Sequence, residues 1–227
     1  MGTPLQTVIF DIGGGAIDKP IKAVQTGGPS GGCLPLDRFN LPIDFDALSE
    51  AGSMIGSGGI VVMDEQTCMV DVAKYFLSFL QDESCGKCVT CRLGIDRMLE
   101  IITDITDGKG TPEQITLLED LAETVSKTSL CALGKTAANP VLSTLRYLRD
   151  EYDAHINDKR CPAGVCQALI SYYIDADKCT GCGVCKRECP HGAISGEKKT
   201  VHEINFELCQ KCGICRSECK FDAIQVL

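Results

Sequence analysis

The sequence is poor in aromatic residues and in histidine. It has no tryptophan, three histidines and 5% aromatic residues over 227 positions. It also lacks an apolar run of the about 20 residues that a membrane-spanning helix needs, and it shows no N-terminal signal peptide. Acidic residues outnumber basic ones, 31 to 22, so the formal net charge is −9, and nucleic-acid phosphates would repel such a chain. We therefore expect a cytoplasmic protein that neither inserts into a membrane nor binds nucleic acid.

Cysteine is the residue type in excess, with 16 copies. Clustered cysteines form disulfides in oxidising compartments and bind metals in reducing ones. Because no signal directs the chain to an oxidising compartment, we interpret the clusters as metal ligands. The acidic charge is compatible with docking to basic patches on redox partners.

Residues 1–67 alternate glycine-rich stretches with short runs that favour strands. The runs lie at residues 7–10, 21–24 and 60–63. Short strands separated by glycine turns are typical of a small α+β domain.

Residues 68–154 show helical periodicity instead. Apolar residues recur at helical spacing in four segments, at about 72–80, 95–105, 118–125 and 141–152. Residues 111–114 supply a threonine N-cap, a proline at the first helical position, and acidic and amide residues after it. Each segment has one apolar face, so we expect a four-helix bundle.

After a connecting segment at 155–167, residues 168–227 contain an internal repeat with a period of 30 residues. A half this short cannot bury a core alone, so the two halves should pack together around whatever their cysteines bind. The repeat aligns two sets of four cysteines, namely Cys179, Cys182, Cys185 and Cys189 with Cys209, Cys212, Cys215 and Cys219.

Each set has the spacing C-x2-C-x2-C-x3-C. In such a run three thiolates hold one cubane cluster and the fourth cysteine holds the other. A pair of zinc knuckles would need only two cysteines per knuckle. The runs resemble those of bacterial two-cluster ferredoxins, although Lys220 stands where the pattern has a proline. The predicted ligands are Cys179, Cys182, Cys185 and Cys219 for one [4Fe-4S] cluster, and Cys209, Cys212, Cys215 and Cys189 for the other.

A third cysteine run, C-x2-C-x2-C, lies at the boundary between two predicted helices. Its members are Cys85, Cys88 and Cys91, and the best candidate for a fourth ligand is Cys131, in the next long loop between helices. The helix after Cys91 would direct its N-terminal amides toward an anionic cluster, and nearby Lys87 and Arg92 would add positive charge. We therefore predict a third [4Fe-4S] cluster here.

Four cysteines remain outside these sets. Cys161 and Cys166 follow His155 closely, and two thiolates with an imidazole suit zinc, which takes four nitrogen and sulfur ligands. The fourth ligand would be Cys68 or, less favourably, Cys33. Such a site would tie the last domain to the helices as a hinge. The alternative is that these are ordinary reduced or buried cysteines.

The other two histidines, His191 and His202, have no partner at ligand spacing. We interpret both as surface residues or as residues that tune a cluster potential.

Residues 83–92, together with Cys131 and the glycine-rich segment 22–33, resemble the C-terminal half of the flavin- and NADH-binding subunit of respiratory complex I. The resemblance implies a β-grasp domain before the helices and one [4Fe-4S] cluster at Cys85. The appended ferredoxin domain is similar to that in beta subunits of NAD-linked, electron-bifurcating iron hydrogenases and of related formate dehydrogenases. In that family the FMN- and NAD(P)-binding domain lies upstream. No G-x-G-x-x-G lies between a strand and a helix here, so we do not expect this chain to oxidise NADH alone.

The combined interpretation is an electron relay. Electrons would pass one at a time between a flavin outside this chain and ferredoxin or a partner subunit, through three [4Fe-4S] clusters. The resemblance implies partners in a multisubunit oxidoreductase, with a hydrogenase- or formate-dehydrogenase-type subunit and a thioredoxin-like 2Fe-2S subunit. The alternative is a structural zinc-binding scaffold that recruits partner subunits.

Overall fold

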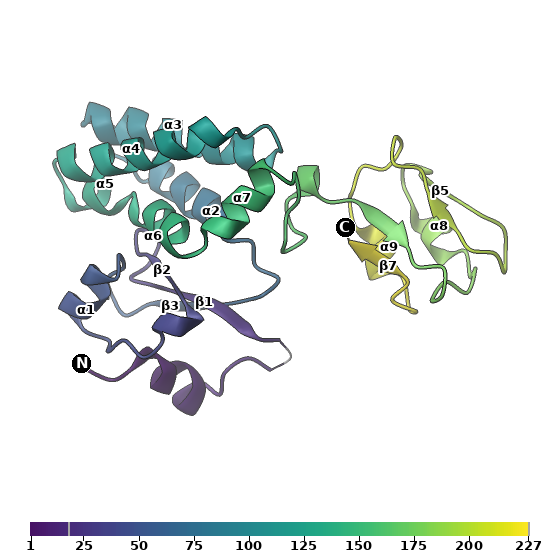
Figure 1. The fold of residues 1–227 in the computed structure, drawn as a ribbon, viewed down its shortest axis with the longest axis horizontal. Coiled ribbons are helices and arrows are strands. Elements are labelled where there is room, and N and C mark those ends of the chain that lie inside the picture. Colours follow the sequence, from purple (N-terminus) through teal and green to yellow (C-terminus); the bar gives the residue numbers. More distant parts are fainter. Residues whose placement is uncertain (18, 227) are drawn as a thin grey trace. The chain divides into compact units, whose positions relative to one another are not determined.

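The computed structural model describes residues 1–17 and 19–226 (Figure 1). Asp18 and Leu227, which the first and last predicted domains include, lie outside the described residues. The chain divides into two compact units, Met1–Val165 and Cys166–Leu227, and each is treated by itself. Both units combine helices with strands.

The first unit opens with a three-stranded antiparallel sheet in the order β2-β1-β3. The central strand β1 (Ile21–Thr26) pairs with β2 (Cys33–Pro35) and β3 (Ile60–Asp64), and a register shift between Ile21 and Ala23 interrupts the second pairing. Three short helices accompany the sheet, η1 (Thr7–Ile12), η2 (Leu36–Arg38) and α1 (Phe45–Glu50). Their shared core is formed by Leu5, Ile9, Ile21, Val24, Leu34, Phe39, Leu48 and Ala51.

The strand expected at residues 7–10 is wrong. The segment forms the π-helix η1, although β-branched residues favour strands. Leu5 and Ile9, four residues apart, both enter the core in the helical form, so tertiary packing overrides the local preference. The strands expected at 21–24 and 60–63 are present as β1 and β3.

A layer of helices follows the sheet in sequence (Figure 1). Helix α3 packs on α2 and α4, and α6 closes the ring by packing on α2 and α4. A capping box and Pro112 start α4 where the sequence predicted it. The helices of the layer are α2 (Met69–Asp82), α3 (Val89–Thr106), α4 (Pro112–Thr128), α5 (Ala132–Thr136), α6 (Asn139–Tyr147) and α7 (Arg149–Ile156).

The fourth predicted helix, 141–152, is divided into α6 and α7 at Leu148, whose φ of −136° and ψ of 37° are not helical. No glycine or proline marks this break. After it, the Glu151 carboxylate accepts from Lys22 Nζ at 2.8 Å and from the Met69 amide at 2.9 Å. The change of direction thus lets α7 connect strand β1 with the start of α2.

In the second unit the two halves of the repeat are joined through their strands. Strand β4 (Tyr172–Ile174), before the first cysteine run, pairs with β7 (Ile224–Val226) after the second run. Strands β5 (Ile194–Ser195) and β6 (Glu203–Ile204) form the other pair. Each cysteine run contains one short helix, α8 (Val184–Glu188) or α9 (Ile214–Ser217), and these helices pack on each other. A short helix, η3 (Gln167–Leu169), precedes β4.

Candidate metal centres

The second unit contains two small pockets lined by cysteines. Each cavity takes three cysteines from one run and the last cysteine of the other run. One is lined by Cys179, Cys182, Cys185 and Cys219, with His202 on its wall. The other is lined by Cys209, Cys212, Cys215 and Cys189, with Tyr172 on its wall. We call them the His202 pocket and the Tyr172 pocket.

Each run reaches its pocket through a tight turn that depends on glycine. Gly183 and Gly213 precede helices α8 and α9, and both have a φ of 79°, which side chains rarely tolerate. The fourth cysteines are fixed by backbone donors, because the Ala193 amide donates to Cys189 Sγ and the Ala223 amide to Cys219 Sγ, each at 3.4 Å. Amide donors to sulfur are the contacts that a thiolate-bound cluster uses.

Burial disfavours the deprotonated form of the buried thiols unless a metal ion binds them. Burial, followed by the nearby Cys179, Cys182 and Cys219, raises the pKa of Cys185. Burial, followed by Cys209, raises the pKa of Cys215 to about 11. Four soft ligands gathered in this way fit an iron–sulfur cluster, whose irons would stabilise the deprotonated sulfurs.

The two histidines of this unit differ from each other. His191 is exposed, whereas the His202 side chain is buried and its Nδ1 lies 3.1 Å from the Thr200 carbonyl oxygen. The surface interpretation therefore fits His191 and not His202, and the alternative that these residues tune a cluster potential stays a prediction. The repeat could have predicted where His202 lies. His202 follows Tyr172 by 30 residues, which is the period of the repeat, and Tyr172 lines the equivalent pocket of the other half.

The third cysteine group lies at helix starts in the first unit. Cys88 is the N-cap of α3 and Cys131 is the N-cap of α5. Cys85 and Cys131 are exposed, while Cys91 is buried. A Cβ built on Gly134 would lie 3.3 Å from Cys91 Cβ, so the first turn of α5 closely approaches the third cysteine of the run.

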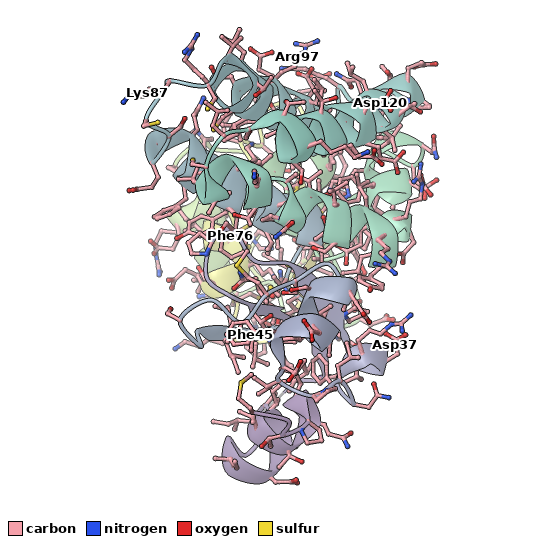
Figure 2. The ribbon with its side chains drawn as sticks, turned by 90° about the vertical axis from the view of Figure 1, so that its left-hand side faces the viewer. Asp37, Phe45, Phe76, Lys87, Arg97 and Asp120 are labelled. Atoms are coloured by element: carbon pink, nitrogen blue, oxygen red, sulfur yellow. The ribbon has the colours of Figure 1, made fainter. Side chains whose placement is uncertain are left out.

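Polar and charged groups surround these cysteines. The Arg92 guanidinium donates to the Gly86 carbonyl and folds over the loop. Lys87 projects at the outer corner of the helical layer, away from the part of the unit that carries Asp37 and Phe45 (Figure 2). The Ser129 hydroxyl is buried without a hydrogen-bond partner among the described residues. A buried donor two residues before Cys131 fits a sulfur-rich anionic group.

A fourth group combines three cysteines with a histidine. The ligand atoms of Cys68, His155, Cys161 and Cys166 all lie within 4.8 Å of one another, and all four residues are buried. We call this group the cysteine–histidine site. Cys68 precedes α2, His155 lies in the last turn of α7, and the other two lie in the loop that follows. Cys33, the less favoured candidate, is not in the group.

Hydrogen bonds orient the histidine of the cysteine–histidine site. His155 Nδ1 lies 2.7 Å from the Glu151 carbonyl oxygen and Nε2 lies 3.4 Å from Cys68 Sγ. Burial lowers the pKa of His155, but hydrogen bonds to Cys161 and Cys68 outweigh it and raise the pKa to about 10. With Nδ1 held by a carbonyl, Nε2 is the nitrogen that faces the three sulfurs, as a metal ligand requires.

Cys33 has a different environment. It is fully buried on β2, its amide donates to Ser143 Oγ at 2.8 Å, and burial raises its pKa to about 12. It is a core thiol that packs with Ala23, Met63 and Met69.

Comparisons with known proteins match the cysteine-bearing regions. Residues 71–155 match the NADH-ubiquinone oxidoreductase-F iron-sulfur binding region. Residues 172–195 and 202–225 each match a 4Fe-4S binding domain. These matches confirm the relationship that the sequence motifs suggested.

Curated relatives extend the match over most of the chain. It is 55% identical to the "NADP-reducing hydrogenase subunit HndC" of Solidesulfovibrio fructosivorans over 203 residues, which are 89% of this chain and 41% of that protein. It is 39% identical to an F-type NADH-quinone oxidoreductase subunit of Rhizobium meliloti (strain 1021) over 71% of this chain and 39% of that protein. The chain thus spans about two fifths of the length of these relatives.

A solved structure is also similar. The "NAD+-reducing [NiFe]-hydrogenase in the H2-reduced state" matches with a TM-score of 0.61 and 26% identity, over 69% of this chain and 26% of that one. Separately, none of the helices in residues 1–17 and 19–226 is both long and apolar enough to cross a membrane.

Proposed function

We propose that this chain, which belongs with the F-type subunits of NADH-quinone oxidoreductases and related hydrogenases through its iron–sulfur region, relays single electrons through three [4Fe-4S] clusters. Thiolate-bound cubanes exchange one electron at a time at low potential. The observation that carries the proposal is that the cysteines of the two C-terminal runs line two pockets and exchange their last members, while a third run follows the same spacing. The scaffold alternative is not favoured, because zinc does not require three such groups.

The ligand assignment follows from these groups. We propose Cys179, Cys182, Cys185 and Cys219 for the His202 pocket, and Cys209, Cys212, Cys215 and Cys189 for the Tyr172 pocket. The third cluster would bind Cys85, Cys88, Cys91 and Cys131. The starts of α3 and α5 would direct backbone amides toward it, which stabilises its negative charge.

The proposed domains follow the same division. The sheet layer, residues 1–67, would be a β-grasp domain, and the ring formed by α2, α3, α4 and α6 would be a four-helix bundle over 68–154. Residues 155–167 would connect it to a two-cluster ferredoxin domain at 168–227. The observed α7 ends at Ile156, so the connection would begin in its last turn.

We assign the cysteine–histidine site to zinc. Three thiolates and one imidazole form a closed tetrahedral set with no position left for substrate, which is the pattern of structural zinc. The partly buried Lys22–Glu151 ion pair supports this site, because the Glu151 carboxylate also binds the start of α2 and the Glu151 carbonyl accepts from the His155 ring. Zinc would fix the 161–166 loop to α2 and α7.

The partners are proposed from the relatives. Their names describe subunits of a hydrogenase and of an NADH-quinone oxidoreductase. Electrons would therefore be exchanged with an NADH-linked flavin on one side. On the other side they would reach ferredoxin, a thioredoxin-like 2Fe-2S subunit, or a hydrogenase- or formate-dehydrogenase-type subunit.

Anaerobic metal and sulfide analysis, with EPR after dithionite reduction, tests the relay. We expect about twelve irons and about twelve sulfides per chain, with interacting signals from reduced clusters. Zinc without sulfide would leave only the scaffold.

A variant pair tests the zinc site. His155→Ala should remove about one zinc per chain and leave iron unchanged. His191→Ala replaces an exposed histidine that lines the Tyr172 pocket, far in sequence from the cysteine–histidine site, and should leave zinc unchanged. Iron loss in His155→Ala without zinc in the parent protein would contradict the assignment.

A further inference from the structure

The hydroxyl of Ser129 is the exception in a region where other hydroxyls are satisfied. The residue is 4% exposed, and its Oγ has no hydrogen-bond partner among the described residues. Leaving such a group unpaired forfeits its hydration without a compensating bond, which destabilises the fold. A buried polar atom of this kind calls for a specific partner, and an ion or ligand is one of the usual ones.

Neighbouring hydroxyls show that local partners are within reach. Thr128 Oγ1 donates to the Thr124 carbonyl at 2.7 Å, and Ser126 Oγ donates to the Lys135 carbonyl at 2.8 Å. Ser129 is the C-cap of α4, and its hydroxyl makes neither kind of contact.

Its position is defined by α5 and by the cysteine run. A Cβ on Gly134 would lie 2.6 Å from Ser129 Oγ and 3.3 Å from Cys91 Cβ. Ser129 also lies two residues before Cys131. The hydroxyl thus lies against the first turn of α5, which also approaches Cys91, and only glycine at position 134 leaves room between them.

A second serine approaches the same cysteine. Ser84 Oγ lies 3.5 Å from Cys91 Sγ. Ser84 belongs to the loop before the run and is half-buried, whereas Ser129 is buried. Two hydroxyls therefore lie near Cys91, and the buried one has no partner in the protein part that the structure describes.

We propose that Ser129 donates an O–H···S hydrogen bond to the cluster bound at Cys85, Cys88, Cys91 and Cys131, and so sets its potential. This rests on the proposed third cluster. Reduction adds negative charge to the sulfurs, so a donor stabilises the reduced state more than the oxidised one and raises the potential. Burial strengthens the effect, since water does not screen the bond. Ser129 is a positioning and tuning residue and not a ligand.

The test compares Ser129→Ala with the parent chain in an EPR-monitored redox titration. One of the three one-electron waves should move to lower potential, by about tenfold in its equilibrium constant, which corresponds to about 59 mV. The reduction potentials of the other two waves should not change. Ser129→Thr keeps the hydroxyl, so its three potentials should match those of the parent chain. Ser126→Ala removes a hydroxyl bonded elsewhere and should leave all three potentials unchanged.

Two further measurements separate the outcomes. Iron and sulfide content show whether the third cluster is present, so its absence contradicts the proposed function and not the role of Ser129 alone.

Exchange into D2O followed by ENDOR should show an exchangeable proton near this cluster in the parent chain. Gly134→Ala, whose Cβ would displace the hydroxyl, should weaken that signal and move the same wave, even if Ser129→Ala fails to assemble. Full iron with unchanged waves, or an unchanged ENDOR signal in Gly134→Ala, would overturn the proposal.

Discussion

The two pockets of the second unit gather their cysteines in the same way and differ in their walls. Cys185 and Cys215 are both buried, and the turns before α8 and α9 share a φ of 79° at glycine. Yet His202 stands in one pocket where Tyr172 stands in the other. If each pocket binds a cluster as proposed, the cluster fixes the ligand positions in both halves, whereas different wall residues would give clusters with identical ligands different potentials.

The backbone shows a second difference between the halves. Gly181 in the first half and Lys211 in the second both have a positive φ, 67° and 54°. A Cβ on Gly181 would lie 2.5 Å from the Thr200 amide nitrogen and carbonyl oxygen, because the loop between β5 and β6 covers this position. Lys211 keeps its side chain and donates to the Ala168 carbonyl at 3.0 Å. The first half is therefore packed more closely around its turn.

The largest expected effect comes from breaking the exchange of fourth cysteines. Cys182→Ala and Cys219→Ala should each damage the same cluster, because both residues line the His202 pocket. Their double variant should lose no more than about four irons of about twelve. Cys182→Ala with Cys189→Ala should lose two clusters, although those two residues belong to one run. The reverse pattern, in which the Cys182/Cys219 double variant loses more iron than the Cys182/Cys189 double variant by metal analysis and EPR, would show that the ligands are not exchanged.

The next effect concerns the covered turn. Gly181→Ala should destabilise the protein, by roughly 1–2 kcal/mol from the left-handed backbone alone, and by more because Thr200 must move. Lys211→Ala keeps a Cβ in the same conformation and should change stability much less. Thermal unfolding of the two holo variants under anaerobic conditions measures the difference. Similar losses in both would mean that the halves are packed alike.

Much of the arrangement of the cysteine groups could be predicted, because their spacing in the sequence determines it. The runs fix which thiols are near one another, and the x3 spacing before the fourth cysteine of each run indicates the exchange of Cys189 and Cys219. The cysteine–histidine site was also predicted, from spacing at Cys161 and Cys166 and from the position of Cys68 before a helix. That its four ligand atoms lie together is observed, and the identity of the metal stays a proposal.

What the sequence did not predict depends on contacts between distant residues. The break at Leu148 has no glycine or proline to mark it, since it serves the contacts of Glu151 with Lys22 and Met69. The π-helix at 7–12 follows from packing of Leu5 and Ile9. Ser129 looks like an ordinary serine at a helix end until the approach of Gly134 and Cys91 is known.

The smallest expected effect would sharpen the comparison of the two walls. His202→Tyr places the same side chain at this position of both pockets. The difference between the reduction potentials of the two clusters of this unit should decrease by up to about 59 mV, which is a tenfold change in a one-electron equilibrium constant. An EPR-monitored titration measures it.

His202→Phe is the matched control for that substitution. It removes the ring nitrogens without adding a hydroxyl, so a wave that moves equally in both variants reports the loss of the imidazole. A wave that moves only in His202→Tyr reports the new hydroxyl, as at Tyr172, whose pKa burial raises. An unchanged gap in both variants would mean that the walls do not set the potentials. The difference would then have to come from the closer packing around Gly181, which the Gly181→Ala variant perturbs directly.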